Sequence, residues 1–440
     1  MKRYIVAMMA LCGAFYGKSQ NEIHKMTLQE CINTGLQNNY ELRIMRNEAN
    51  ISKNNVTLGN AGYLPSISLE SGYSGYARTN KQKMNDGVKN TAHPLNNSVD
   101  VGINLSQSLF EGFKIQAEYD RLKALAAQGD LQVRMQIENL ISDIASDYYN
   151  HINQLIQLRN LLSAVKLSEE RLRIVEAQYQ IGSMSGLELK QARVDLNEDK
   201  SRFIQQQENI YSSVIQLNRL MGIKQVEQRT GVNDTVIAIN TMLDLEDLKS
   251  KMFQNNSELL LAKKQIHISE QDYKILKARN YPYVRLNAGY GYDFNTLSTA
   301  SYDHQQTLGV NYGVSMGISV FDGMNRRREQ KNAKIVIENK ELALEDQELQ
   351  LCGELYQIYN AYQTQIRLFT LEKENLVTAQ DNYETAMDRY KLGDLSGIEL
   401  REAQQSLLNA KERLLSAEYN TKLCEISLML ISGQVAQYAD

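Results

Sequence analysis

The sequence predicts a mainly helical protein that also carries strands of a membrane β-barrel, and three observations lead to this fold class. The two halves of the chain are similar in sequence. Each half holds two segments with alternating apolar and polar residues and a very long stretch without proline. Duplication indicates two copies of one structural unit. The alternation is typical of half-buried strands, and the long stretches predict helical hairpins.

Composition excludes several functional classes. The 440 residues include 48 Lys and Arg against 52 Asp and Glu, a formal net charge of -4, so we expect no nucleic-acid partner. The five histidines show no metal-ligand spacing and no C-x-x-C is present, so no metal and no cofactor is predicted. In "GSMSG" at Gly182, Met184 stands where a nucleophile elbow needs serine. The chain is therefore not expected to be an enzyme.

Residues 1–19 have the order of a signal peptide. Lys2 and Arg3 precede an apolar run from Tyr4 to Tyr16, and small residues follow before Gln20. The alternative is a buried N-terminal strand. No later apolar stretch reaches the roughly 18 residues of a membrane helix, so membrane insertion has to use strands.

The duplication is visible in several places. "YQIGSMSGLEL" at Tyr179 matches "YKLGDLSGIEL" at Tyr390, and the register then holds without a gap to Gly222 and Gly433. Upstream, "TLQECINTGLQNNYEL" matches "DLEDLKSKMFQNNSEL", and "LFEGF" matches "VFDGM". The predicted division is a first repeat over 20–222, a linker over 223–243 and a second repeat over 244–440.

Strands are predicted over about 66–77, 98–110, 284–294 and 308–321. In the second of them, Val99, Val101 and Ile103 alternate with polar residues or glycine. Roughly ten residues suffice to cross a bilayer at a tilt. A soluble sandwich sheet alternates too. The signal peptide, the tyrosines near strand ends and the polar loops 78–97 and 295–306 favour the membrane.

Four strands cannot close a barrel, and an open edge is not tolerated in lipid. The protein must therefore form oligomers. Two copies supply eight strands and three supply twelve, and only the larger number leaves room for an open pore.

Long helices are predicted over about 113–181 and 324–392, each roughly 100 Å long. Apolar residues recur at spacings of three and four, as in Leu155, Leu158 and Leu162, which is typical of coiled-coil or barrel-like helix packing. An independent helical bundle explains this periodicity equally well. It does not explain why each long helix begins directly at a strand.

Together these features resemble the TolC-like family of outer-membrane efflux and secretion channels, over essentially the whole mature chain. The motifs that carry the resemblance are "TLQECI", "QNNYEL", the Leu-Pro and Tyr-Pro strand entries, the Phe-(Glu/Asp)-Gly strand exits, and the glycine turn followed by Glu-Leu. The resemblance implies a homotrimer in which each protomer contributes four strands to a 12-stranded β-barrel. This barrel continues into a periplasmic α-barrel made of the duplicated long-helix hairpins.

The resemblance also implies a function. Such a channel lies in the outer membrane of a Gram-negative bacterium, in contact with outer-membrane lipid, and extends into the periplasm. It is the exit duct of a tripartite export system, fed by an inner-membrane pump of the resistance-nodulation-division or ABC type through a periplasmic adaptor (membrane fusion) protein. Drugs, small metabolites, metal ions and polypeptides all stay open as cargo.

The hairpin tips, at about 182–187 and 393–398, are by this resemblance the sites of adaptor docking. The residues concerned are Gly182, Ser183, Ser185, Gly186, Gly393, Asp394, Ser396 and Gly397.

The tunnel entrance of the family is held by carboxylates and by a tyrosine bound to an arginine. Tyr390 matches the tyrosine, and Glu188, Glu399 and Glu402 match carboxylate positions. Leu395 occupies the arginine position, and the nearby cations are Arg389, Arg401 and Arg193. Each glutamate can instead be a solvated helix-start residue favoured by the helix dipole. If the Tyr390 hydroxyl bridges the hairpins, its loss should raise the resting conductance modestly.

Two further alternatives stay open. Arg326, Arg327 and Arg328 follow the last strand, where cations at a helix start are unfavourable. They could line the tunnel, meet anionic lipid head groups or be solvated. The rival function is a trimeric structural or adhesion protein anchored in the outer membrane, although hairpins that turn back speak against a one-way stalk.

Overall fold

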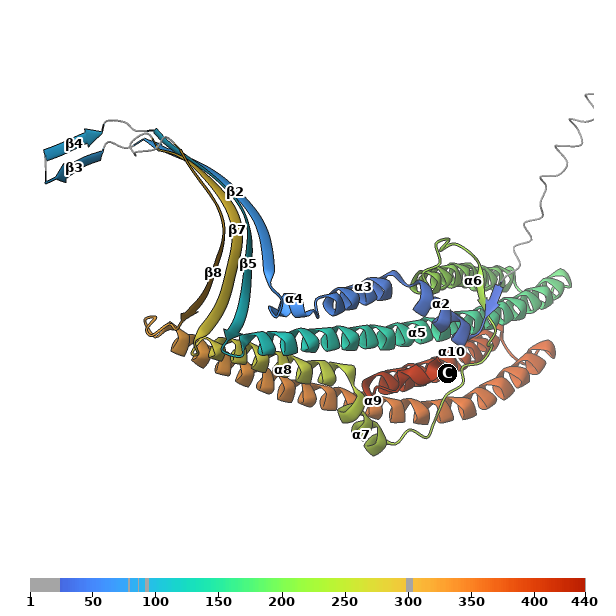
Figure 1. The fold of residues 1–440 in the computed structure, drawn as a ribbon. Coiled ribbons are helices and arrows are strands. Elements are labelled where there is room, and N and C mark those ends of the chain that lie inside the picture. Colours follow the sequence, from blue (N-terminus) through green and yellow to red (C-terminus); the bar gives the residue numbers. More distant parts are fainter. Residues whose placement is uncertain (1–23, 78–79, 86, 92–94, 298–303, 440) are drawn as a thin grey trace, which may run out of the picture. The chain divides into compact units, whose positions relative to one another are not determined.

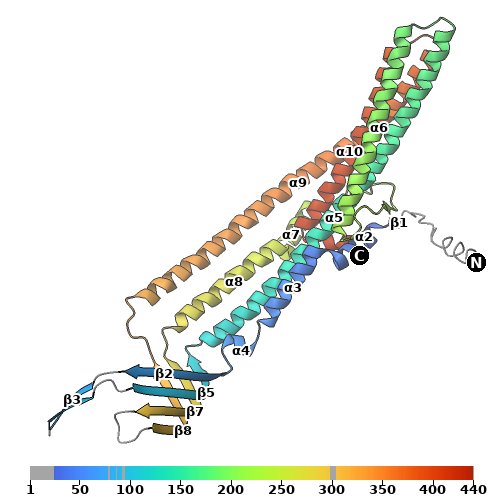
Figure 2. The ribbon, with the colours of Figure 1, turned by 90° about the horizontal axis from the view of Figure 1, so that it is seen from above.

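The computed structural model describes residues 24–77, 80–85, 87–91, 95–297 and 304–439. The predicted signal peptide over 1–19 lies outside these residues. The chain divides into two compact units, one over 1–44, 134–257 and 348–440, the other over 45–133 and 258–347. Figures 1 and 2 show the elements of both units.

The second of these units holds a four-stranded antiparallel sheet (Figure 1). Its strands are β2 (Ser66–Ala77), β5 (Leu95–Glu111), β7 (Tyr283–Leu297) and β8 (His304–Gly317), in the order β2-β5-β7-β8. Because each half of the sequence supplies two adjacent strands, the pairing of β5 with β7 joins the two repeats in one sheet.

The register of the sheet separates its two faces. One row across all four strands is apolar and exposed: Leu69, Ile103, Tyr290 and Val310, with exposed fractions of 73%, 51%, 52% and 69%. The next row is Ser68, Asn104, Gly289 and Asn311. Since successive side chains of a strand point to opposite faces, the alternation predicted from the sequence gives one apolar and one polar face.

Several strand bounds differ from the predicted ones: β5 begins at Leu95 and not 98, β7 runs to Leu297 and not 294, and β8 begins at His304 and not 308. β8 ends at Gly317 and not near Phe321, because Gly317 pairs with Tyr283, the first residue of β7, and no partner strand extends further. The predicted polar loop 78–97 contains a hairpin of β3 (Asn80–Met84) and β4 (Gly87–Thr91). Its residues are mostly polar and carry no apolar periodicity that marks strands.

The helices repeat in matched lengths. α5 (Lys114–Gln180) and α9 (Asn325–Lys391) have 67 residues each, and α6 (Gly186–Leu220) and α10 (Gly397–Ile431) have 35 each. The shorter helices are α2 (Leu28–Asn38), α3 (Tyr40–Asn54), α4 (Leu58–Ala61), α7 (Leu245–Asn255) and α8 (Ser257–Ala278), followed at the C-terminus by a 3₁₀ helix, Val435–Tyr438. None of the helices in the described ranges is long and apolar enough to cross a membrane.

The duplication extends to single contacts. Asn39 donates from Nδ2 to the carbonyl oxygen of Leu220 at 3.0 Å, and Asn256 donates in the same way to Ile431 at 3.0 Å. Each bond satisfies one of the carbonyl groups that the end of α6 or α10 leaves without a helical partner. The recurring "QNN" motif therefore closes the end of a helix in both repeats.

The inter-repeat segment 223–243 is held in place at both ends. Its strand β6 (Thr230–Val232) pairs in parallel with β1 (His24–Met26). The backbone N–H of Asn240 donates to the buried carboxylate of Glu425 at 2.9 Å. The same carboxylate accepts from Lys422 and from Tyr438, both at 2.7 Å, so one side chain ties the segment to α10 and to the C-terminal turn.

Both strand-to-helix junctions use two successive left-handed residues. Gly112 and Phe113 have φ of 62° and 71°, and Gly323 and Met324 have φ of 70° and 63°. The surroundings differ, because a Cβ on Gly112 would collide with the carbonyl oxygen of Ala278 and lie 2.8 Å from Cβ of Tyr281. On Gly323 the nearest atom would be 3.6 Å away.

This difference predicts unequal effects of one substitution. Gly323→Ala should cost only the left-handed strain, about 1–2 kcal/mol, whereas Gly112→Ala adds a collision with backbone and should cost at least twice as much. Thermal denaturation of the purified variants, followed by circular dichroism in detergent, measures both. Equal shifts of the two midpoints would show that the space around Gly112 plays no part.

Candidate functional site

Each hairpin tip consists of a helix stop followed at once by a helix start. Gly182 and Gly393 have φ of 79° and 80°. Ser183 and Asp394 donate their backbone N–H groups to Gln178 and Arg389 at 2.9 and 3.0 Å. This is the Schellman ending, in which a left-handed residue lets the chain satisfy the last carbonyls of a helix. The duplicated glycine is thus explained by backbone geometry.

The start of the next helix is a capping box in both repeats. Ser185 Oγ accepts from the N–H of Glu188, and Ser396 Oγ accepts from the N–H of Glu399, both at 3.2 Å. In turn, the backbone N–H groups of Ser185 and Ser396 donate to the carboxylates of Glu188 and Glu399, at 3.4 and 3.0 Å. The bonds from the Ser396 backbone and side chain lower the pKa of Glu399. Glu188 and Glu399 are therefore capping residues at the starts of α6 and α10.

A groove of about 690 Å³ lies between the two tips, within one unit of the fold. Of the predicted site residues, the lining includes Ser185, Glu188, Tyr390, Ser396, Gly397 and Glu402. Glu399, Gly182, Ser183, Gly186, Gly393 and Asp394 are not among the lining residues. The structure therefore brings together carboxylates of both hairpins, Glu188 from α6 and Glu402 from α10, beside Tyr390.

Tyr390 packs its ring into a core and forms no hydrogen bond through its hydroxyl within the described chain. It is 1% exposed and packs in an apolar cluster with Val175, Leu400 and Leu407, while its repeat counterpart Tyr179 is 47% exposed. Its hydroxyl has no hydrogen-bond partner among the described residues. Burial raises the pKa of this hydroxyl, and Arg171 opposes the rise. Within one chain Tyr390 joins the hairpins by packing, and not by a hydrogen bond.

The three cations considered near Leu395 are all paired. Arg389 binds Asp394 at 3.0 Å and Arg193 binds Glu176 at 3.1 Å, each within its own hairpin. Arg401 alone crosses from α10 to the other hairpin. Leu395 packs against the apolar cluster around Tyr390. An apolar contact therefore occupies the place where the family has its arginine.

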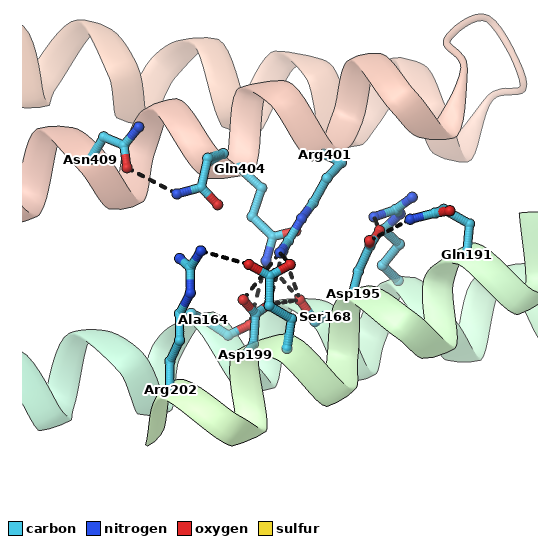
Figure 3. A network of polar contacts seen from close by, with 12 residues as sticks. Ala164, Ser168, Gln191, Asp195, Asp199, Arg202, Arg401, Gln404 and Asn409 are labelled. Carbon is cyan, nitrogen blue, oxygen red and sulfur yellow. Dashed lines mark hydrogen bonds and ion pairs between the residues drawn. The ribbon is translucent and has the colours of Figure 1, made fainter. Parts of the chain in front are cut away.

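The crossing made by Arg401 is a buried ion pair (Figure 3). Arg401 donates to both carboxylate oxygens of Asp199 on α6, at 2.8 and 3.1 Å, and the two side chains are 16% and 1% exposed. Ser168 on α5 donates to Asp199 at 2.5 Å and accepts from Gln404 at 2.9 Å. Burial alone would lower the pKa of Arg401, but Asp199 raises it. Side chains of α5, α6 and α10 thus meet in one network.

A second buried pair lies closer to the tips. Arg171 on α5 donates to Asp195 on α6 at 2.6 Å, and the side chains are only 5% and 8% exposed. Gln191 donates to the other oxygen of Asp195 at 2.9 Å. Both Arg171 and Asp195 line the groove. Together the two pairs place three buried charges, Arg171, Asp195 and Asp199, and the partly buried Arg401 beneath the tips.

Sequence reasoning named Arg401 but missed Arg171, Asp195 and Asp199, although the repeat contains a signal for these three charges. In the register that aligns Tyr179 with Tyr390, Asp199 falls on Ala410 and Asp195 on Ser406. Arg171 falls on Asn382 in the same register. A position that is charged in one repeat and small or neutral in the other indicates that the two hairpins have different buried contacts there.

These features define a class of protein: an outer-membrane channel that combines a β-barrel with an α-barrel. The chain belongs to the outer membrane efflux protein family, whose model matches residues 31–223 and 248–434. The predicted family, fold class and outer-membrane location are thereby confirmed.

Individual relatives are distant but cover most of the chain. The probable outer membrane lipoprotein SilC of Salmonella typhimurium is 21% identical over 91% of this chain and 84% of its own length. The outer membrane protein TolC of Escherichia coli K12 is 19% identical over 90% of this chain and 80% of its own. The crystal structure of the Campylobacter jejuni CmeC outer membrane channel aligns with a TM-score of 0.78 at 17% identity, covering 92% of this chain and 85% of that one.

The buried pair between the hairpins predicts an asymmetric cost of substitution. Asp199→Ala removes the doubly bonded partner of Arg401, which then keeps Glu198 at 3.8 Å as its ionic partner, and should destabilise the chain by about 2–3 kcal/mol, whereas an apolar pair, Asp199→Leu with Arg401→Met, should be close to neutral. Denaturant unfolding in detergent measures both. Glu176→Ala, which breaks the exposed pair with Arg193, is the matched control and should cost no more than about 1 kcal/mol. Equal losses for Asp199→Ala and Glu176→Ala would contradict a structural role of the buried pair.

Proposed function

We propose that the chain is the outer-membrane exit duct of a tripartite export system, working as a homotrimer with a periplasmic adaptor and an inner-membrane pump of the resistance-nodulation-division or ABC type. The observation that carries the proposal is the sheet order β2-β5-β7-β8, which leaves β2 and β8 as edge strands of a sheet with one apolar face. Unpaired edges are not tolerated in lipid, so other copies have to complete the barrel. Three copies supply twelve strands, enough for an open pore.

Exposed apolar residues on the helices support the same assembly. On α9 they recur at every seventh position: Ile335, Leu342, Leu349 and Tyr356, which are 45%, 56%, 74% and 46% exposed. A heptad repeat of apolar residues is the pattern of a helix that packs along another helix. In the proposed trimer, helices of the next copy cover this stripe.

The tips support docking of an adaptor. Ile181 and Leu392 occupy equivalent positions in the two repeats and are 80% and 84% exposed. Leu187 and Ile398 form a second equivalent pair and are 76% and 77% exposed. Apolar side chains of this exposure, rimmed by polar turns, are typical of protein contact sites. The adaptor is thus proposed to contact both tips, including the turns around Gly182, Ser183, Gly186, Gly393 and Asp394.

The entrance of the duct is proposed to lie at the same tips, with Glu188, Glu399, Glu402 and Tyr390 around the axis of the trimer. Threefold repetition of these carboxylates creates a strongly negative ring. Such a ring attracts cations, and multivalent cations most strongly. Behind this ring, Arg401 holds the two hairpins together through Asp199, and Arg171 joins α5 to α6 within the first hairpin through Asp195.

The test of the duct is electrical and structural together. The purified chain should form a trimer by native mass spectrometry in detergent and give steady, cation-preferring conductance in a planar bilayer. A trimer without conductance would favour the structural or adhesion protein instead. A stable monomer would contradict the proposed barrel.

Neutralising the entrance should weaken cation block. Glu399→Gln with Glu402→Gln should reduce block by divalent and trivalent ions from the periplasmic side by about tenfold or more, because part of the charge ring is lost, and the trimer should persist. Single-channel recording measures the block. The control is Glu170→Gln, a carboxylate 43% exposed on α5 outside the groove. Unchanged block in the double variant would remove these glutamates from the entrance.

The burial of Tyr390 predicts that its ring, and not its hydroxyl, keeps the hairpins together. Tyr390→Phe should leave resting conductance unchanged and should not destabilise the fold, since the lost hydroxyl has no partner among the described residues. Tyr390→Ala removes the buried ring and should raise resting conductance, at a cost of about 3–5 kcal/mol in stability. A clear rise of conductance in Tyr390→Phe would instead show that the hydroxyl hydrogen-bonds to another copy and helps keep the entrance closed.

A further inference from the structure

Three consecutive arginines open α9, directly after the strand-to-helix junction at Gly323 and Met324. We propose that this cluster, together with the exposed apolar residues beside it, binds the phosphate group of an anionic phospholipid. The inference rests on the proposed orientation, in which β8 crosses the membrane and its end at Gly317 faces the periplasm. The lipid would then belong to the periplasmic leaflet.

The apolar part of the site precedes the arginines. Ile318, Val320, Phe321 and Met324 are 53%, 87%, 74% and 60% exposed. They line a surface cavity of about 610 Å³ together with Arg326 and Arg327. A cavity with apolar walls and cations at one end matches an acyl chain next to a charged head group.

The arginines differ in how firmly they are bound. Arg326 is anchored, because it donates to Asp322 at 3.0 Å and to the carbonyl oxygen of Arg279 at 3.1 Å, and its side chain is only 14% exposed. Arg328 is 62% exposed, donates weakly to Asn325 at 3.4 Å and meets Glu329 only at 3.8 Å. Glu329 is bound more closely by Arg279. In the described part of the chain, Arg327 is exposed and makes no hydrogen bond or ion pair.

Positive charge is in excess at this site. The cations are Arg279, Arg326, Arg327, Arg328 and Lys331, and the anions next to them are Asp322 and Glu329. Three positive charges thus have no matching anion among the residues that the structure describes. Arginine presents a planar fork of donors that binds phosphate or carboxylate oxygens in pairs, so an anion with such oxygens matches the excess charge.

The first repeat shows that the junction does not need these cations. Gly112 and Phe113 make the same left-handed turn as Gly323 and Met324. The residues that follow there are Ile115, Gln116 and Ala117, at the positions of Arg326, Arg327 and Arg328. Cations in the first turn of a helix oppose the helix dipole, so their presence in one repeat alone calls for an anion beyond those that the described residues supply.

A lipid phosphate fits better than a free phosphate. Free phosphate would satisfy the arginines but leave Val320 and Phe321 in water. An anionic phospholipid satisfies both parts at once, since its acyl chain covers the apolar residues while its head group meets Arg327 and Arg328. Basic residues near an anionic membrane surface each strengthen binding several-fold.

The test is native mass spectrometry of the full-length protein in detergent, titrated with phosphatidylglycerol and, separately, with phosphatidylcholine. The wild type should retain phosphatidylglycerol preferentially. Arg327→Gln with Arg328→Gln should weaken this retention by about thirtyfold, while phosphatidylcholine binding stays the same. The matched control, Arg173→Gln with Arg193→Gln, removes two arginines that are 76% and 60% exposed on the tip helices and should behave as the wild type.

Three results would overturn the inference. The first is wild-type retention of phosphatidylglycerol by the glutamine variant. The second is displacement of phosphatidylglycerol by an equal concentration of inorganic phosphate, which would assign the arginines to a free anion. The third is a change of oligomeric state in the variant, which would assign them to contacts between copies. Bilayer conductance of the wild type is recorded in parallel. Conductance without lipid preference would contradict only the lipid site. Lipid preference without conductance would contradict only the proposed duct.

Discussion

The unpaired backbone groups along the edge strands β2 and β8 are the constraint on which the rest of the structure depends. An antiparallel sheet pairs every interior N–H and C=O group, but its two edge strands each keep one row unpaired. In water such a row is solvated, whereas in hydrocarbon each group costs several kcal/mol. One edge comes from the first repeat and the other from the second, so β8 of one copy is the natural partner of β2 of the next. In the proposed assembly this head-to-tail contact closes into a ring.

The two repeats share the features that end and start their helices, and they differ in the charged contacts near the tips. The helix stops, the capping boxes and the Asn39 and Asn256 bonds occur in both halves, because each solves the same backbone problem. The buried pair of Arg171 and Asp195 occurs only in the first hairpin, and Asp199 receives its arginine from the second. Buried charges tolerate few alternative positions, so they fix how the hairpins meet more strictly than apolar packing does.

Most of the fold was accessible from sequence, because its elements are long and strictly periodic. The period of two predicted the sheet, with Leu69 and Ile103 in one row as the register requires, and the absence of proline predicted α5 and α9 within one residue at each end. Short elements were missed: β1 and β6 have three residues each, too few for any period to show. The glycine turns and the capping glutamates were recognisable since their chemistry is local.

The candidate site was predicted only in part, for a physical reason. Glu188 and Glu402 lie in a chain pattern that can be matched to a family, whereas Arg171, Asp195 and Asp199 look like ordinary solvated helix residues. Whether such a residue is buried depends on the rotation of each long helix about its axis, which the neighbouring helices decide. The same holds for Tyr390 and Tyr179, identical in motif and yet opposite in exposure.

The equal lengths of the paired helices constrain how this chain can change in evolution. α5 and α9 share one length and α6 and α10 share another, so the turns at Gly182 and Gly393 stand at the same number of residues from the junction glycines, Gly112 and Gly323. Every inserted residue would move one turn by about 1.5 Å and rotate its apolar face by about 100°. A viable insertion therefore has to occur in all four helices, and in steps of seven residues that restore the facing side chains. The lengths of these four helices can therefore change only together, and only by whole heptads.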